Sequence, residues 1–443
     1  MSGDPVSTER LSEYATPLET TDPTADLDDL RPLTDWFEDA TVVALGEATH
    51  GTREFFRLKH RLIRLLVEEL GYRAVGLEAS FAETLAINDY VVRGEGDLRE
   101  ALAGIYFWTW DTEEVLALIE WLREFNAERP LDDRVRFYGF DMQHTQQAGA
   151  AVSEFLATVD PAYLREVSHG LGRIERMVFK DAESADDRCL IEAERDAAAL
   201  ADRLDEHERE YAARTSEREW RLARQHCRVL EQAVDQTVEQ VTEGYIAAAR
   251  LRDRYMAETV EWLLDYGDAD RIALWGHNAH VARTGDDEGD RRPLGSHLAG
   301  TFGDRYVAVG CEFCRGSFRA RPWESEGDRS VEEFTVEPLP ERGPDLVDAA
   351  EERDPSSEDL PEPLLTAALS DLATDRACVD LGAADADPEL SGWLDRPHLM
   401  HAIGALFSEG EREHHAYGAV RPTEQFDGLL YVEESTPSVP VDD

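Results

Sequence analysis

Short apolar runs alternate with amphipathic segments through the first third of the chain. The apolar runs have the length and composition typical of buried strands and lie at residues 41–46, 73–78 and 135–140. Apolar residues at helical spacing predict helices in the segments between and beside them, near residues 55–66, 81–93 and 112–127. Because strands alternate with helices, we expect βαβ units and a mainly parallel sheet.

The pattern changes after about residue 150. Residues 150–265 contain no convincing strand-like run. Apolar positions there step by threes and fours with one longer gap, as a long amphipathic helix requires: Trp220, Ala223, Cys227, Leu230, Val234 and Val241. Strand-like runs return at residues 271–276, 306–311, 375–381 and 428–433. We therefore predict an α/β fold with a mainly parallel central sheet flanked by helices and a large all-helical insertion.

The same pattern sets the expected domain boundaries. We expect a loosely held acidic arm at residues 1–30, the first part of the α/β core at 31–150, and the helical insertion or subdomain at 151–265. The second part of the core then covers residues 266–435, and residues 436–443 form a C-terminal tail.

The charge balance restricts the partners that this chain can bind. Among its 443 residues, 45 Lys and Arg stand against 95 Asp and Glu, which gives a formal net charge of −50, and Lys59 and Lys180 are the only lysines. Nucleic acids and anionic membranes bind basic surfaces, so we expect neither as a partner. High salt screens self-repulsion of this size, which is typical of a cytoplasmic protein from a salt-loving organism. The chain shows no signal-peptide pattern and no apolar run of the ~20 residues that a membrane span needs, so we expect a soluble cytoplasmic protein.

The five cysteines predict neither a disulfide framework nor a metal site. Their number is odd and their spacing irregular. Cys311 and Cys314 form a single C-x2-C beside the apolar run at residues 306–310, where core packing is favoured over half of a zinc site.

Residues suited to acid–base chemistry follow four of the predicted strands. In an open α/β sheet, functional groups gather at the carboxyl ends of the strands. Those ends carry Glu47 and His50, Glu78, Asp141, and His277 with His280. In a regular helical turn, positions i and i+3 lie roughly 5–6 Å apart, so Glu47 could orient His50 as a general base.

Several motifs together resemble the erythromycin esterase family, from about residue 35 to residue 435. They are Leu45-Gly-Glu-Ala-Thr-His-Gly-Thr-Arg-Glu-Phe-Phe56, Leu58-Lys-His-Arg-Leu62, Gly76-Leu-Glu-Ala-Ser-Phe81, Trp110-Asp-Thr-Glu-Glu-Val115, Gly139-Phe-Asp141, Arg254-Tyr-Met-Ala257 and Gly276-His-Asn-Ala-His280. The combination is specific, whereas each motif alone is weak.

The resemblance implies hydrolysis of a carboxylic ester or macrolactone without a metal, so we expect no cofactor. It implies a catalytic base at His50, supporting carboxylates at Glu47 and Glu78, and site histidines at His277 and His280. His50 would take a proton from the attacking water. His277, His280 or Lys59 would stabilise the oxyanion or protonate the leaving alkoxide.

The substrate implied is a small ester or lactone. Candidate substrate-binding residues are Lys59, Asp141, Arg53 and Arg254. The macrolide-cleaving members carry Arg where this chain has Lys59, and Lys lacks the planar bidentate fork of Arg. The resemblance therefore predicts the hydrolytic apparatus and leaves erythromycin as one candidate substrate among several.

Three alternatives stay open at the level of sequence. Ser80 lies at a strand-to-helix turn, as the nucleophile of a serine hydrolase would, but the flanking glycines of G-x-S-x-G are absent. A metal-dependent hydrolase could use the same Glu and His cluster as ligands. A non-catalytic binding protein with a degenerate site is the third alternative, and turnover would discriminate against it.

Overall fold

The computed structural model describes residues 8–178, 187–267, 269–285, 292–323, 330–338, 363–407 and 417–441. The chain divides into two compact units. Unit 1 consists of Met1–Val75, Trp108–Val135 and Asp270–Asp443, and unit 2 of Gly76–Phe107 and Arg136–Ala269.

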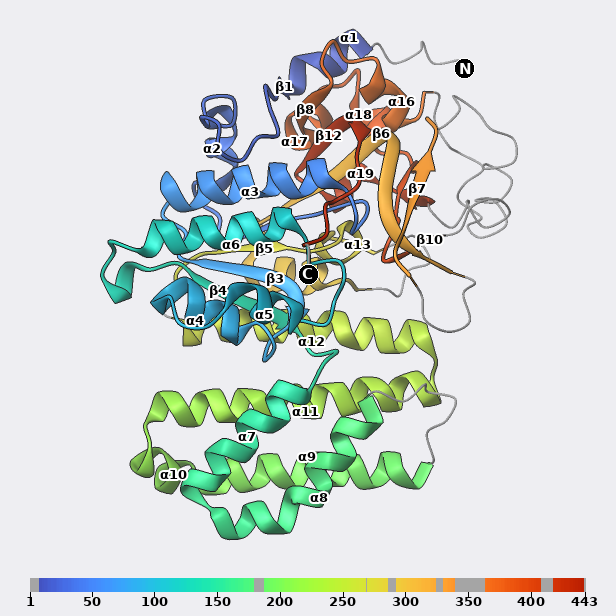
Figure 1. The fold of residues 1–443 in the computed structure, drawn as a ribbon. Helices are drawn as coiled ribbons and strands as arrows, with labels where there is room; N and C mark the ends of the chain where they lie inside the picture. The colour runs from blue at the N-terminus through green and yellow to red at the C-terminus, as the bar shows by residue number, and fades with distance from the viewer. Residues whose placement is uncertain are drawn as a thin grey trace. The chain divides into compact units, whose positions relative to one another are not determined.

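In unit 1 the main path of the sheet runs β1-β8-β12-β6-β2-β5 (Figure 1). Their bounds are β1 Ala15–Pro17, β8 Arg376–Asp380, β12 Gly428–Ser435, β6 Tyr306–Pro322, β2 Val42–Leu45 and β5 Ile272–Trp275. β2 pairs in parallel with β5 and β6, and β12 pairs in parallel with β6, whereas β8 is antiparallel to β1 and β12. Every residue of β2 and β5 is buried, as expected of short apolar strands inside a parallel sheet.

The far half of β6 carries a second set of strands. β7 (Glu332–Val336) pairs antiparallel with it and β10 (Leu406–Phe407) pairs in parallel, while β9 (His398–His401) and β11 (Tyr417–Val420) form a separate antiparallel pair. β6 is much longer than the predicted strand at 306–311. It continues past Gly316, whose φ of +127° favours glycine and whose added Cβ would lie 2.3 Å from the Ser435 carbonyl oxygen.

The main helices of unit 1 cover the segments that the sequence predicted. α3 spans Arg53–Glu68 and α6 spans Glu113–Asn126. Thr112 caps α6, because its hydroxyl accepts a hydrogen bond from Val115 N, and Glu113 and Glu114 lie in the first turn. The shorter helices of this unit are α1 Thr8–Leu11, α2 Thr34–Phe37, α13 Asn278–Val281, α14 Leu294–Phe302, α16 Leu365–Ser370, α17 Leu381–Asp385, α18 Ser391–Leu394 and α19 Pro422–Gln425.

The N-terminal segment differs from the expected loose arm. From Thr8 onward it packs on unit 1: β1 adds a strand to β8, and four of its leucines are buried, namely Leu11, Leu18, Leu27 and Leu30. These leucines follow neither helical nor strand periodicity in an acidic stretch, so only the tertiary structure reveals that they are buried.

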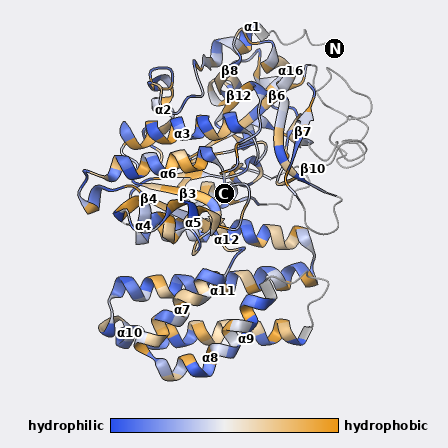
Figure 2. Ribbon diagram, in the orientation of Figure 1, coloured by the Kyte–Doolittle hydropathy of each residue, from blue (hydrophilic) through white to orange (hydrophobic). Residues whose placement is uncertain are grey.

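Unit 2 contains two neighbouring strands and most of the long helices. The strands are β3 (Ala74–Ser80, which begins two residues before the unit) and β4 (Arg136–Asp141). Its helices are α4 Leu85–Arg93, α5 Leu98–Ala103, α7 Gln146–Val159, α8 Pro161–Val178, α9 Asp187–Glu206, α10 Glu208–Arg214, α11 Glu217–Thr242 and α12 Tyr245–Tyr266. Hydrophilic and hydrophobic residues alternate along α7 to α11, the amphipathic pattern predicted from residues 220–241 (Figure 2). The α/β fold, with its mainly parallel sheet and helical region, is confirmed.

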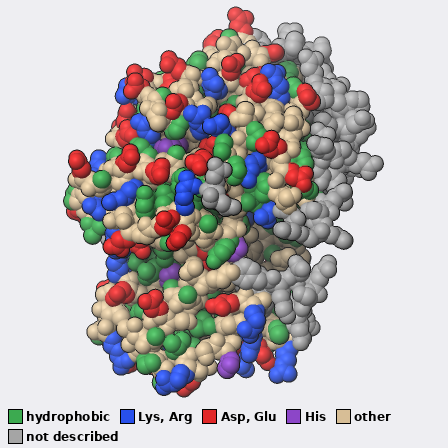
Figure 3. Space-filling view, viewed as in Figure 1, with side chains coloured by type: hydrophobic (Ala, Val, Ile, Leu, Met, Phe, Trp, Pro, Cys, Tyr) green, Lys and Arg blue, Asp and Glu red, His purple; other side chains and the backbone are tan. Residues whose placement is uncertain are grey.

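The surface reflects the composition. Asp and Glu side chains are scattered over the face shown in Figure 3, with Lys and Arg among them, so on this face the negative charge is not confined to one patch. In the described part of the chain, every helix is too short or too polar to cross a membrane.

Candidate active site

Glu47 and His50 meet in the loop that joins β2 to α3. His50 Nδ1 lies 2.6 Å from Glu47 Oε1, a hydrogen bond between the two side chains. The pair was predicted, but its geometry was not, because α3 begins only at Arg53 and the loop provides the contact. Gly46 allows this path, since a Cβ there would lie 2.2 Å from the Asn278 side-chain oxygen.

Glu47 is fully buried and held on both of its oxygens. Its Oε2 accepts hydrogen bonds from Lys59 Nζ and from Trp275 Nε1, the latter at 2.8 Å. The Lys59 ammonium also lies 4.4 Å from the centroid of the Trp275 ring, a cation–π contact. Lys59, predicted to bind substrate, is itself fully buried and bound to Glu47.

These contacts keep Glu47 ionised. Burial alone would raise the pKa of Glu47, but the charge of Lys59 and the hydrogen bond from His50 outweigh it and lower the pKa. An ionised Glu47 can only accept, so His50 carries its proton on Nδ1. In the described chain, His50 Nε2 has no hydrogen-bond partner, and this atom is not fully buried. With its side chain 13% exposed, His50 therefore presents Nε2 to solvent as an acceptor.

His277 lies next to His50, with 5.0 Å between the ring centroids. It precedes α13, where its Nδ1 accepts from Ala279 N at 3.1 Å and its Nε2 lies 3.1 Å from the Ile403 carbonyl oxygen. Accepting from an N–H and donating to a carbonyl fixes the neutral tautomer with the proton on Nε2. His280 lies at the third position of α13 and is buried.

Aromatic side chains enclose the pair. The Trp110 ring contacts the His50 ring edge to face, with 5.7 Å between centroids, and packs against Phe56 and Trp275. Trp275 was not singled out from the sequence. The signal that could have identified it is strand register, because Leu45 of β2 pairs with Trp275 of β5 and Glu47 follows two residues later.

Unit 2 contains a second ionic cluster at the carboxyl ends of β3 and β4. Arg252 Nη2 on α12 donates to Glu78 Oε1 at 2.9 Å and to Asp141 Oδ2 at 2.8 Å. Burial alone would lower the pKa of Arg252, but Asp141 and Glu78 raise it. This cluster joins the predicted residues Glu78 and Asp141 through an arginine that was not predicted.

Arg254, the arginine that was predicted instead, lies two residues further along α12. Its side chain is half exposed, lies 3.7 Å from Glu258 and stacks on Tyr255. The pattern of the helix could have identified Arg252, because it lies four residues after buried Ala248 and four before buried Met256. A charged residue in a buried stripe requires an internal partner.

The remaining candidates have structural contacts. Arg53 Nε forms an ion pair with Glu114 Oε1 at 3.1 Å. Ser80 Oγ is buried and accepts from His144 N at 2.8 Å, which does not favour the exposed nucleophile of a serine hydrolase. Within the described ranges, no three His, Cys, Asp or Glu side chains converge as metal ligands.

The chain is thus an α/β protein with a carboxylate–histidine pair after the end of a buried strand. Comparison with known proteins places it in a family: the model of the erythromycin esterase family matches residues 67–435, and the chain belongs to that family. This match begins after the segment that contains Glu47 and His50.

Named relatives support hydrolase function. The chain is 26% identical over 325 residues to the Escherichia coli protein named erythromycin esterase type II, covering 66% of this chain and 74% of that protein. It is 25% identical over 288 residues to YbfO of Bacillus subtilis (strain 168), whose name includes hydrolase, covering 62% of this chain and 63% of that one.

Solved structures share the fold. A Bacillus cereus protein has a TM-score of 0.81 at 24% identity, covering 99% of this chain and 100% of that one. A histidine variant of the erythromycin esterase EreC, in its open conformation, has a TM-score of 0.70 at 18% identity, covering 100% of both chains. At these identities the likeness shows the fold alone.

Proposed function

We propose that the protein hydrolyses a carboxylic ester or lactone by water that His50 activates. His50 Nε2 accepts a proton from the attacking water as the water oxygen bonds to the ester carbonyl carbon. The Nδ1 proton stays on the ring, and its hydrogen bond to the ionised Glu47 stabilises the imidazolium that forms. Proton return to the leaving alkoxide completes the reaction.

The observation that carries this proposal is the asymmetric environment of the His50 ring. One nitrogen is bound to a buried, ionised carboxylate at 2.6 Å, while the other has no partner within the described chain. Lys59 and Trp275 fix Glu47 in turn, so the orientation of His50 is built into the fold before substrate binds. Lys59 in this account is a positioning residue.

Two predicted histidines of unit 1, His277 and His280, are further parts of the proposed site. His277 is held neutral by two backbone contacts and lies against the His50 ring, where it would shape the approach of water. His280, in the same unit, is a further candidate for contact with the substrate or the leaving group. Glu78 and Asp141 belong to the cluster with Arg252 in unit 2. The proposed steps use only the side chains of unit 1 named above and water. Removal of metal ions should therefore leave the rate of hydrolysis unchanged.

The proposed substrate is a small ester or lactone. The relative from Escherichia coli is named for erythromycin, so a macrolide is one member of a screening panel that also contains aryl esters and simple lactones. The net charge of −50 causes self-repulsion that concentrated salt screens, so the panel is tested in concentrated salt. This condition follows from the proposal that the protein works in the cytoplasm of a salt-loving organism. His50→Ala should lower kcat/KM by roughly 10²–10⁴, and His207→Ala on the helical part of unit 2 is the matched control. Equal activity in the wild type and His50→Ala would contradict the proposal.

A further inference from the structure

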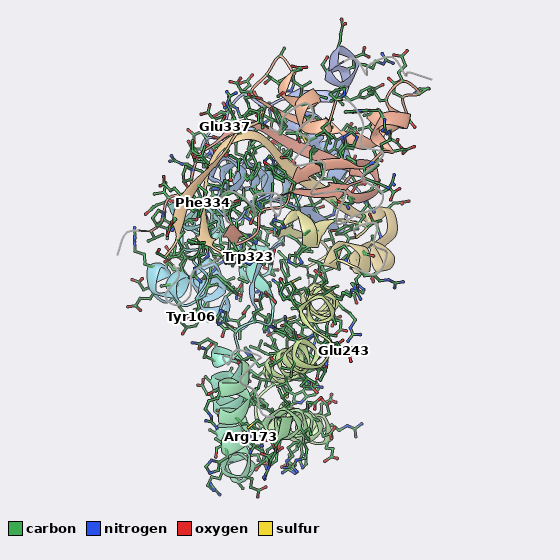
Figure 4. All side chains as sticks on the ribbon, turned by 90° about the vertical axis from the view of Figure 1, so that its right-hand side faces the viewer. Tyr106, Arg173, Glu243, Trp323, Phe334 and Glu337 are labelled. Atoms are coloured by element: carbon green, nitrogen blue, oxygen red, sulfur yellow. The ribbon has the colours of Figure 1, made fainter. Side chains whose placement is uncertain are left out.

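Arg319 lies against the residue that follows His50. On β6, Arg319 N donates to the Gly51 carbonyl oxygen at 3.2 Å, and Ser438 N donates to the same oxygen at 2.9 Å. The contact is close enough that a Cβ on Gly51 would lie 2.0 Å from the Arg319 carbonyl oxygen. β7, which pairs with this part of β6, carries Phe334, and Glu337 directly follows its last residue; both are labelled in Figure 4.

The Arg319 guanidinium has no ionic partner in the described chain. Its Nη1 is buried and has no hydrogen-bond partner in the described chain. Its Cζ lies 5.5 Å from the centroid of the Trp108 ring. Glu333 on β7 pairs directly opposite in the strand register but forms no ion pair with it. Burial lowers the pKa of Arg319 even though Glu114, Asp111 and Glu333 act in the other direction.

This lack of a partner is unexpected in so acidic a chain, where 95 carboxylates face 45 basic residues. Two other arginines withdrawn from solvent bind carboxylates: Arg61 binds both oxygens of Asp29, and Arg283 binds both oxygens of Asp427. A guanidinium N–H group withdrawn from water without an acceptor is costly, and such groups often mark a site that a ligand completes.

Two further polar atoms, on residues that adjoin or contact Gly51, are also buried without a hydrogen-bond partner in the described chain. They are Thr52 Oγ1 and Ser438 Oγ. Thr52 follows Gly51 directly, and Ser438 binds its carbonyl through the backbone. Three unsatisfied hydrogen-bond donors therefore belong to residues in contact with one glycine next to the proposed base.

We propose that Arg319 binds a carboxylate carried by the substrate, which makes esters of dicarboxylic acids the preferred substrate class. The inference rests on the proposed hydrolysis at His50. A carboxylate supplies the charge and the two parallel acceptor oxygens that match the guanidinium fork. Of the acids nearby, Glu114 is already compensated by Arg53 and by Val439 N, so it does not occupy Arg319.

The test compares two aryl esters of glutaric acid, one with a free distal carboxylate and one with that group capped as a methylamide. Wild type should cleave the free acid with the lower KM. Arg319→Met should raise KM for the free acid about tenfold to a hundredfold and leave the capped ester unchanged, since a charge-assisted hydrogen bond is lost. Arg319→Lys should have a KM for the free acid between those of the wild type and Arg319→Met. Arg315→Met, on the same strand and paired with Glu433 and Glu434, should behave as wild type.

Equal effects of Arg319→Met on both esters, or on neither, would overturn the proposal. Thermal unfolding of each variant identifies a change caused by misfolding, and Arg319→Lys retains the charge if Arg319→Met fails to fold. Calorimetric titration of glutarate into the His50→Ala variant, with and without Arg319→Met, measures carboxylate binding without turnover. If the wild type cleaves neither ester but glutarate binding depends on Arg319, hydrolysis fails and the carboxylate site stands.

Discussion

Each unit of this protein contains a buried ionic cluster at strand ends, and the two clusters differ in one respect. In unit 1, Glu47 is bound by Lys59, Trp275 and a histidine with a solvent-facing nitrogen. In unit 2, the carboxylates Glu78 and Asp141 are bound by Arg252, which stays charged at any working pH.

The comparison shows that buried charge does not by itself identify catalysis. The arginine cluster fixes two carboxylates by ion pairs with Arg252, whose guanidinium does not change protonation state near neutral pH. The histidine cluster has the same carboxylate anchoring and adds a ring nitrogen that can accept a proton. We therefore expect substitutions at Glu47 and His50 to reduce the rate of hydrolysis. Substitution of Arg252 should mainly reduce the stability of the fold.

Glu47→Gln should cause the largest loss of activity. It keeps the size of the side chain but removes the charge that stabilises the His50 imidazolium. We expect kcat to fall by roughly 10²–10⁴ with KM within about threefold of the wild type. Steady-state kinetics on an ester that the wild type cleaves measures this. A kcat within a factor of a few of the wild type would mean that Glu47 has no part in the rate.

Apart from changes at Glu47 and His50, Arg252→Met should lower the free energy of unfolding the most. It leaves Glu78 and Asp141 buried without their cation, which typically costs about 3–5 kcal/mol. Denaturant unfolding measures the loss. Arg254→Met is the matched control, because Arg254 is half exposed and should change stability by less than about 0.5 kcal/mol. Similar values for the two variants would remove the distinction between these arginines.

Lys59 tests whether anchoring of Glu47 matters for rate. Lys59→Met removes the cation and should lower both kcat and stability, because Glu47 is then buried with only Trp275 and His50 as partners. Lys59→Arg keeps the charge and should retain more than about a tenth of kcat, with the remaining loss due to crowding in a fully buried site. A Lys59→Met variant with lower substrate affinity and unchanged kcat would instead assign Lys59 to substrate binding.

Acid should destabilise the protein through its buried neutral histidines. Burial lowers the pKa of His398 to about 4, and its ring accepts from Leu365 N while its other nitrogen contacts the Trp393 carbonyl oxygen. Above pH 6.5 neither the folded nor the unfolded state binds this proton. Between pH 6.5 and 4 only the unfolded state does, so stability falls by up to about 1.4 kcal/mol per pH unit for this one residue.

Unfolding measured from pH 7 to pH 4 for the wild type and His398→Gln tests this. The variant should start less stable and show a shallower loss with pH. Parallel curves for the two proteins would show that His398 does not account for the acid sensitivity.

Chelation should have the smallest effect. We expect full activity after exhaustive treatment with a chelator. A loss that is restored by one divalent cation would support the metal-dependent alternative.

The sequence allowed prediction of the elements with strong periodicity and of the pair at the end of β2. β2, β5, α3 and α6 were predicted because their apolar patterns are local. Glu47 and His50 were predicted because they are three residues apart, although the loop rather than a helical turn joins them. Residues that act through long-range contacts could not be found in this way. Trp275 and Arg319 come near the Glu47–His50 loop only because parallel strands and the path of β6 bring them there.

The N-terminal segment illustrates the same limit. Its buried leucines are spaced without a period, and β1 is stabilised by pairing with β8, more than 350 residues away in sequence. Local propensity cannot report such a partner.

The most direct test of His50 as the base is chemical rescue. His50→Ala should lower kcat/KM by roughly 10²–10⁴, and added imidazole should restore part of the rate in a saturable way. The same imidazole should not restore Glu47→Gln, whose His50 ring still fills the space. A His50→Ala variant that hydrolyses esters at the wild-type rate, with or without imidazole, would contradict the account.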